Sequence, residues 1–169
     1  MTLTIDNEAL KTQLKSLQLK RNGALEKLFG HQLLTKSGLL STSEACKSKK
    51  RVAIYFSAHW CPPCKQFTPL LAEMYQDAKR IGEHELEVIF CSSDHDSASF
   101  RSYFQSMPWV AVPFEEERTR SSLSSFYSIQ GIPALFVLDS FGNVIDANAR
   151  NAVATSGGSA ADCLRQWSR

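Results

Sequence analysis

Three features are missing from the sequence: long hydrophobic runs, an excess of charge of one sign, and internal repeats. Its longest apolar stretches, such as 52–56 and 134–138, have the length of a strand and fall far short of the roughly 20 residues that span a bilayer. The 19 basic and 17 acidic residues leave a net charge of +2 and are scattered along the chain. We therefore expect a soluble protein that binds neither a membrane nor nucleic acid.

The N-terminus also lacks the features of a targeting segment. Residues 1–8 contain no basic stretch followed by an apolar one, and their acidic residues argue against a transit peptide. We therefore expect a cytoplasmic protein. Its 169 residues, 43% of them hydrophobic, suffice for one core but not for two, so we expect a single globular unit that acts as a monomer.

The spacing of the cysteines argues against a framework of disulfide bridges. The five cysteines are an odd number, and Cys46, Cys91 and Cys163 lie far apart. We expect these three to be structural or incidental, with Cys91 on a buried strand. One close pair remains, formed by Cys61 and Cys64.

The hydrophobic pattern predicts alternating strands and helices, and hence an α/β fold with a mixed sheet flanked by helices. The first part of the chain is expected to hold a helix at 7–20 that ends at 22–23, short strands and loops within 25–46, and a strand at 51–58. The rest is expected to hold a helix at 65–81, a strand at 86–92, helices at 97–105 and 118–127, a hairpin of 134–138 with 144–146, and a helix at 160–167. We divide the chain into an N-terminal helical extension, residues 1–24, and a domain of residues 25–169.

The segment Trp60-Cys61-Pro62-Pro63-Cys64 has the features of a redox dithiol. A thiol attacks a disulfide as the thiolate, and the start of a helix lowers the thiol pKa because unpaired N–H groups and the helix dipole favour the anion. Pro62 suits the first helical position and Pro63 stiffens the turn, which leaves the Cys64 amide as the first donor able to reach the Cys61 sulfur. We expect Cys61 to be the exposed nucleophile and Cys64 the buried resolving thiol, with no metal and no other cofactor.

Two other interpretations of this pair remain open. A Cys-x-x-Cys pair can supply half of a structural zinc site, which needs four ligands, but the sequence has no second pair of Cys or His with ligand spacing. The pair can also form an inert structural disulfide, which would be unusual in the cytosol.

Residues 55–64, Tyr-Phe-Ser-Ala-His-Trp-Cys-Pro-Pro-Cys, resemble the active-site segment of the tryparedoxin and nucleoredoxin branch of the thioredoxin superfamily. The likeness continues in the motifs at 67–69, 92–94, 107–114 and 129–133, and it covers roughly residues 25–150. It implies the thioredoxin fold. Ordinary thioredoxins carry Gly-Pro between their cysteines, where this chain has Pro62 and Pro63.

The resemblance also implies roles for residues around the dithiol. Pro133 corresponds to a cis proline beside the disulfide, and the backbone of Ile132 to the segment that pairs with the substrate chain. Trp60 corresponds to a surface tryptophan at the site, the alternative being a core aromatic. The predicted substrate-binding residues are Trp60, Pro62, Pro63, Ile132, Pro133 and Arg150.

The sequence departs from ordinary thioredoxins at Tyr55, where they bury an aspartate that accepts the proton of the resolving thiol. The tyrosine agrees with the tryparedoxin and nucleoredoxin branch. Asp94 is our candidate acid for that proton, with a solvated loop carboxylate as the alternative. His59 either helps to hold the thiolate when protonated or is an exposed bystander.

The sequence departs from tryparedoxins near its C-terminus. Tryparedoxins carry an Arg-Ala-Arg segment associated with trypanothione, whereas this chain reads Asn148-Ala149-Arg150 and so lacks one of the two cationic contacts. Trp167 either takes the place of the family's C-terminal tryptophan or caps a helix.

These features predict a thiol:disulfide oxidoreductase. Reduced Cys61 is expected to attack disulfides of protein partners such as oxidised peroxiredoxins, and trypanothione or another dithiol is expected to re-reduce the pair. The alternative is a nucleoredoxin-like redox-sensing module that binds signalling partners. The chain length favours the enzyme, because nucleoredoxins as a family are multidomain and tryparedoxins are single domains near this size.

Overall fold

The computed structural model describes residues 6–168 and has a seven-stranded sheet in the order β2-β1-β5-β4-β3-β6-β7. Its centre is β3 (Arg51–Ser57), which runs parallel to β4 (Leu86–Ser92) and antiparallel to β6 (Ala134–Asp139). The outer strands are β1 (Gln32–Thr35), β2 (Gly38–Ser41), β5 (Val110–Ala111) and β7 (Val144–Asp146). The predicted α/β fold with a mixed sheet is confirmed, and its arrangement is that of the thioredoxin fold.

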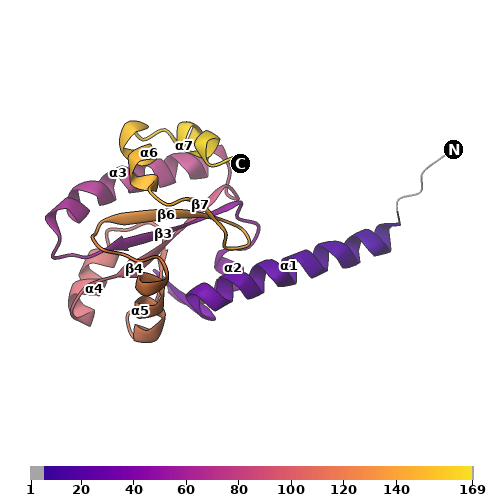
Figure 1. Cartoon of the computed structure of the whole chain (residues 1–169), viewed down its shortest axis with the longest axis horizontal. Helices are drawn as coiled ribbons and strands as arrows, with labels where there is room; N and C mark the ends of the chain where they lie inside the picture. Colours follow the sequence, from indigo (N-terminus) through magenta and orange to yellow (C-terminus); the bar gives the residue numbers. More distant parts are fainter. Residues whose placement is uncertain (1–5, 169) are drawn as a thin grey trace.

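Helices cover both faces of this sheet (Figure 1). One buried cluster joins the sheet to α3 (Pro62–Ile81), α4 (Ser97–Phe104), α6 (Ala149–Thr155) and α7 (Ala160–Gln166). A second cluster joins it to α1 (Asn7–Phe29), α2 (Thr42–Ala45) and α5 (Glu117–Phe126). The apolar runs 52–56 of β3 and 88–91 of β4 fit this double cover, because both faces of each strand are buried.

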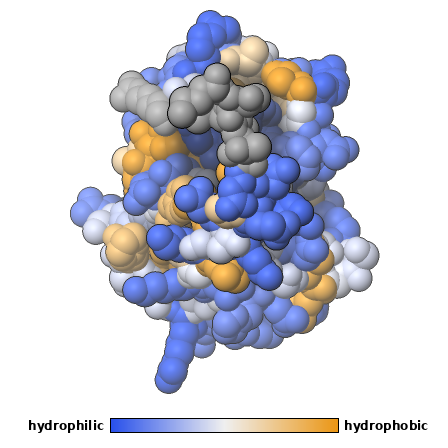
Figure 2. All heavy atoms as spheres, turned by 90° about the vertical axis from the view of Figure 1, so that its right-hand side faces the viewer, coloured by the Kyte–Doolittle hydropathy of each residue, from blue (hydrophilic) through white to orange (hydrophobic). Residues whose placement is uncertain are grey.

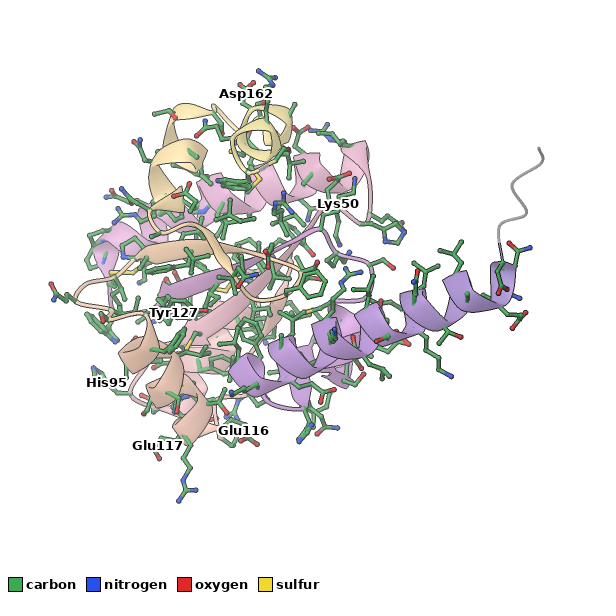
Figure 3. All side chains as sticks on the ribbon, turned by 45° about the vertical axis from the view of Figure 1, so that its right-hand side comes forward. Lys50, His95, Glu116, Glu117, Tyr127 and Asp162 are labelled. Carbon is green, nitrogen blue, oxygen red and sulfur yellow. A yellow bond between two sulfur atoms is a disulfide. The ribbon has the colours of Figure 1, made fainter. Side chains whose placement is uncertain are left out.

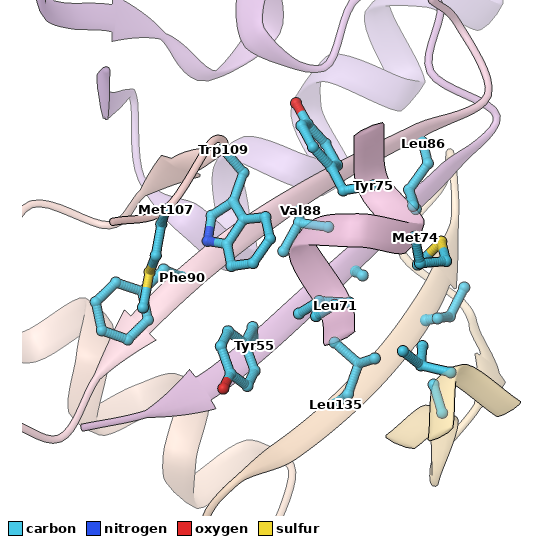
Figure 4. Close-up of a cluster of buried hydrophobic side chains, with 14 of the residues drawn as sticks. Tyr55, Leu71, Met74, Tyr75, Leu86, Val88, Phe90, Met107, Trp109 and Leu135 are labelled. Atoms are coloured by element: carbon cyan, nitrogen blue, oxygen red, sulfur yellow. The ribbon is translucent and has the colours of Figure 1, made fainter. Parts of the chain in front are cut away.

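Aromatic side chains dominate the first cluster, part of which is shown in Figure 4. The ring of Trp109 meets those of Tyr55 and Tyr75 nearly edge-on, with centroids 5.9 and 5.7 Å apart. Phe90 of β4 stacks on Phe100 of α4. This packing fixes α3 and α4 against the sheet end at which the cysteines lie.

The prediction that the first helix ends at Asn22-Gly23 is wrong, because α1 continues to Phe29 and ends at Gly30, whose φ is +81°. Leu25 and Phe29 are buried against the second cluster, and this burial outweighs the cost of about 1 kcal/mol for a glycine inside a helix. The N-terminal half of α1 projects from the body (Figure 1). The division of the chain at residue 24 stays a prediction.

The C-terminal part contains one predicted and one unpredicted helix. The predicted closing helix is confirmed as α7, whereas α6 has no counterpart in the sequence interpretation. Trp167 is the C-cap residue of α7 and is also buried, with its Nε1–H donating to Asp146 Oδ2 at 3.0 Å. The expected role as a helix cap is therefore confirmed, and the correspondence to the family's C-terminal tryptophan stays a prediction.

Seen from the side on which α1 projects, the surface is mostly hydrophilic, with separate apolar patches (Figure 2). Among residues 6–168, no helix has both the length and the apolar character needed to cross a membrane.

Candidate functional site

The end of β3 and the start of α3 bring the two cysteines together. Cys61 is the N-cap residue of α3, with an extended backbone, and Pro62 and Pro63 occupy the first two helical positions as predicted. Cys61 and Cys64 form a disulfide with Cα atoms 5.2 Å apart.

The Cys61 sulfur contacts two backbone groups. The Cys64 N–H donates to Cys61 Sγ at 3.3 Å, which confirms the expected donor, and the Ile132 carbonyl oxygen lies 3.7 Å from the same sulfur. When the pair is reduced, this N–H and the positive end of α3 favour a thiolate on Cys61.

The prediction that Cys61 is exposed is wrong, although Cys61 is more accessible than Cys64. Only 4% of its surface is accessible, against 0% for Cys64, because Ala58 and Ile132 pack around the pair. The order of exposure agrees with Cys61 as the attacking thiol.

The segment that faces the disulfide contains the predicted cis proline. The Ile132–Pro133 peptide bond is cis, Pro133 is buried, and Ile132 is half-buried. The Ile132 carbonyl lies beside the Cys61 sulfur, so a backbone polar group borders the site.

Trp60 lies on the surface next to Cys61, and the alternative of a core aromatic is wrong. Its side chain is 53% exposed, its Nε1–H donates to the Ser93 carbonyl oxygen at 3.0 Å, and its ring stacks on that of His95. The two rings are 5.6 Å apart and inclined by 9°. His95, which is labelled in Figure 3, comes from the loop after β4. This stack gives the site a flat aromatic rim.

Asp94 is buried, so the alternative of a solvated loop carboxylate is wrong. Its Oδ1 accepts the His59 N–H at 2.7 Å, and its Oδ2 accepts the Ser92 hydroxyl at 2.8 Å. No hydrogen bond among the described residues joins Asp94 to either active-site sulfur. The carboxylate therefore holds the loop that precedes Cys61. The imidazole of His59 is half-buried and lies edge-on to Tyr103, with ring centroids 5.7 Å apart.

A cluster of four buried hydroxyls lies under the first turns of α3, and sequence reasoning identified only one of its members. Tyr55 and Tyr103 each lie 2.7 Å from the Thr68 hydroxyl, and Ser57 bridges the two tyrosines at 3.2 and 2.7 Å. Thr68 also donates to the Cys64 carbonyl oxygen at 2.9 Å. Burial raises the pKa of Tyr55, so this hydroxyl stays neutral at physiological pH.

Arg150 lies on α6, with its guanidinium 5.7 Å from the centre of the Phe67 ring. It lines a cavity of about 290 Å³ together with Phe67, Asn148, Asn151 and Ala154. The structure gives Arg150 no contact with Cys61 or Cys64.

The remaining three cysteines are buried free thiols. Burial raises the pKa of Cys46 and of Cys91 to about 12, and it raises the pKa of Cys163 as well. Cys91 lies on a buried strand, as predicted.

The described residues, 6–168, contain no group of three or more His, Cys, Asp or Glu side chains that could hold a metal ion. Among the described residues, the two further ligands that a closed zinc site at Cys61 and Cys64 would need are therefore not gathered around the pair.

Comparison with known proteins places the chain among thioredoxin-like relatives. The family model described as "Thioredoxin-like" matches residues 49–144. The chain is 52% identical to mouse nucleoredoxin over 99 residues, which are 59% of this chain and 22% of that protein. It is 39% identical to tryparedoxin of Trypanosoma brucei brucei over 122 residues, which are 72% of this chain and 82% of the relative.

A solved structure shares the fold and about a third of the aligned sequence. Tryparedoxin from Trypanosoma brucei superimposes with a TM-score of 0.73 at 35% identity, covering 82% of this chain and 95% of that one. The matches with mouse and bovine nucleoredoxin span only about a quarter of those proteins. The chain belongs to the thioredoxin-like family, in the branch of the tryparedoxins and nucleoredoxins.

Proposed function

We propose that this protein reduces disulfides of partner proteins, such as oxidised peroxiredoxins, through Cys61 and Cys64. The observation that carries this proposal is the position of the Cys61 sulfur at the N-cap of α3, with its Sγ 3.3 Å from the backbone nitrogen of Cys64. Relatives on the tryparedoxin branch, at 39% identity, support the proposal.

The reaction proceeds in two exchanges. The Cys61 thiolate attacks one sulfur of the substrate disulfide, forms a mixed disulfide and expels the other substrate sulfur as a thiolate. The Cys64 thiolate then attacks Cys61 Sγ, which forms the Cys61–Cys64 disulfide and releases the second substrate thiolate. Two electrons pass from the protein dithiol to the substrate, and protons from water neutralise the released thiolates.

The surface that the substrate meets is shaped by Trp60, Pro62, Pro63 and the cis-proline segment. The Ile132 carbonyl, 3.7 Å from Cys61 Sγ, stands where a substrate backbone could pair beside the sulfur under attack. The exposed ring of Trp60 offers an apolar contact on the same rim.

Trypanothione is the proposed reductant of the oxidised pair. A tryparedoxin II that is 31% identical to this chain has been solved in complex with glutathionylspermidine, a compound of related chemistry. Arg150, exposed at the 290 Å³ cavity, is the proposed contact for its peptide part. Asn148 stands where a second arginine would strengthen that contact, so we expect weaker docking than in tryparedoxins.

The alternative function is a redox-sensing module in which the Cys61–Cys64 state controls binding of a signalling protein. The 52% identity to mouse nucleoredoxin favours this candidate. In such a module the same disulfide chemistry occurs, but continuous turnover is incidental.

Consumption of NADPH in the presence of oxidised peroxiredoxin separates these functions. Three mixtures are compared: trypanothione with trypanothione reductase, thioredoxin with thioredoxin reductase, and no reducing system, with Cys61→Ser as control. Turnover with trypanothione that Cys61→Ser abolishes supports the proposal. Turnover that Cys61→Ser abolishes and that occurs only in the mixture with thioredoxin and its reductase overturns the choice of reductant. No turnover in any mixture overturns the enzymatic function in favour of the redox-sensing module.

A further inference from the structure

A cavity of about 430 Å³ lies beside the dithiol, between the first turns of α3 and the end of α4. Neither the chemistry of the disulfide nor the proposed trypanothione contact uses it. Its lining includes two polar groups from the active-site segment, hydroxyls from α4 and an apolar strip of α3, namely His59, Lys65, Ser102, Tyr103, Pro69 and Ala72.

The cavity is close enough to Cys61 for one substrate chain to reach both. The Lys65 N–H donates to the Cys61 carbonyl oxygen at 3.2 Å, so Lys65 stands one helical turn, about 5.4 Å, from the cysteine along α3. An extended peptide advances about 3.3 Å per residue. A side chain two to four residues from the attacked cysteine therefore spans the distance.

The charge of the lining selects the kind of side chain. Lys65 is exposed, none of the ion pairs found among residues 6–168 includes it, and no acidic side chain lines the cavity. The ammonium of Lys65 and the Ser102 hydroxyl can both donate hydrogen bonds into the opening. Pro69 and Ala72 present an apolar wall suited to the methylene groups of a glutamate.

We propose that this cavity binds a carboxylate side chain of the substrate protein, two to four residues from the cysteine that Cys61 attacks. The inference rests on the proposed disulfide reduction and adds a substrate preference to it. Lys65 is then a specificity-determining residue, which acts on the encounter with the substrate and not on the sulfur exchange.

Two disulfide-bonded peptides test the preference. They have the same sequence except that glutamates on both sides of the cysteine in the first are glutamines in the second. Pre-reduced full-length protein is mixed with each peptide, and the second-order rate constant of reduction is measured at low and high salt. The variants are Lys65→Gln and, as matched control, Lys79→Gln, which removes the same charge from α3 about 21 Å farther along the helix.

The glutamate peptide should react about fivefold faster at low salt, the effect of one surface ion pair, and the advantage should shrink at high salt. Lys65→Gln should make the two peptides react alike, whereas Lys79→Gln should keep the difference. Equal rates with the unmodified protein, or a difference that survives Lys65→Gln, overturn the inference alone. No reduction of either peptide overturns the proposed function and the inference together.

Discussion

The hydroxyl oxygens of Tyr55 and Thr68 lie 2.7 Å apart beneath the turn of α3 that carries Cys64. Thr68 connects this contact to the backbone of Cys64, and Ser57 and Tyr103 complete the cluster. Four hydroxyls thus occupy the region where a thioredoxin buries an aspartate. We infer that the cluster fixes the position of the resolving cysteine.

Removing one hydroxyl from this cluster should destabilise the fold. Tyr103→Phe leaves the hydroxyls of Ser57 and Thr68 each with one partner fewer, at a cost of about 1–2 kcal/mol in the free energy of unfolding. Urea denaturation measures this change.

Tyr127→Phe is the matched control for that experiment. The Tyr127 hydroxyl is buried and has no hydrogen-bond partner among the described residues, and its ring packs between Phe56 and Phe136 near α5 (Figure 3). This substitution should leave stability unchanged or raise it. Equal losses in the two variants would contradict a bonded cluster at Tyr103.

Gly23 tests the continuity of α1 through the position where the sequence suggested a stop. A Cβ atom at Gly23 would meet nothing within 4 Å, so Gly23→Ala should stabilise the protein by about 0.5–1 kcal/mol. Gly142→Ala should instead destabilise it, because Gly142 has a φ of +87° and its Cβ would lie 3.2 Å from Leu28. Thermal unfolding compares the variants, and a loss of stability in Gly23→Ala would contradict a continuous helix.

Glu87 should make stability depend on pH. Burial raises the pKa of this carboxyl above its ordinary 4.5, although Tyr75 and the Val88 N–H both donate to it. Because the folded state then binds the proton more tightly than the unfolded state, the contribution of Glu87 is present below about pH 4.5 and is lost as the pH rises through the folded-state value.

The variant Glu87→Gln keeps an acceptor oxygen but does not ionise. Its melting temperature relative to the unmodified protein should therefore increase as the pH is raised from 4 to 8. Glu83→Gln, an exposed site in the same region, should show no such trend. A constant difference across this pH range would show that Glu87 does not titrate in the folded protein.

In the reduced protein, Cys61 should react with alkylating agents much faster than the buried Cys46 and Cys91. With a pKa of about 12, Cys46 and Cys91 hold only about one part in 10⁵ as thiolate at pH 7. After reduction, iodoacetamide should label Cys61 first, and mass spectrometry should find Cys46 and Cys91 labelled only after denaturation. Labelling of either buried thiol as fast as Cys61 in the native protein would contradict this account.

The sequence sufficed for the parts of the site that depend on local chemistry. Two prolines after Cys61 predicted its N-cap position and the Cys64 donor, since a proline offers no N–H. Motif likeness predicted the cis bond at Pro133 and the surface position of Trp60.

Features that depend on distant segments were not predictable in this way. Tyr103 comes from α4, and its local sequence pattern does not predict a hydrogen bond to Thr68. The burial of Asp94 depends on the loop at His59, and α1 passes Gly23 because Leu25 meets the sheet. Tertiary packing decided each of these positions, so local propensity alone could not.

The roles of the two cysteines are the central claim, and trapping of the mixed disulfide tests them most directly. Cys64→Ser is incubated with a protein disulfide such as insulin, and the products are analysed by mass spectrometry without reductant. The account predicts a covalent adduct through Cys61 that dithiothreitol releases, and no adduct and no disulfide reduction with Cys61→Ser. Full reducing activity in Cys61→Ser, or adducts formed through Cys64 in that variant, would contradict it.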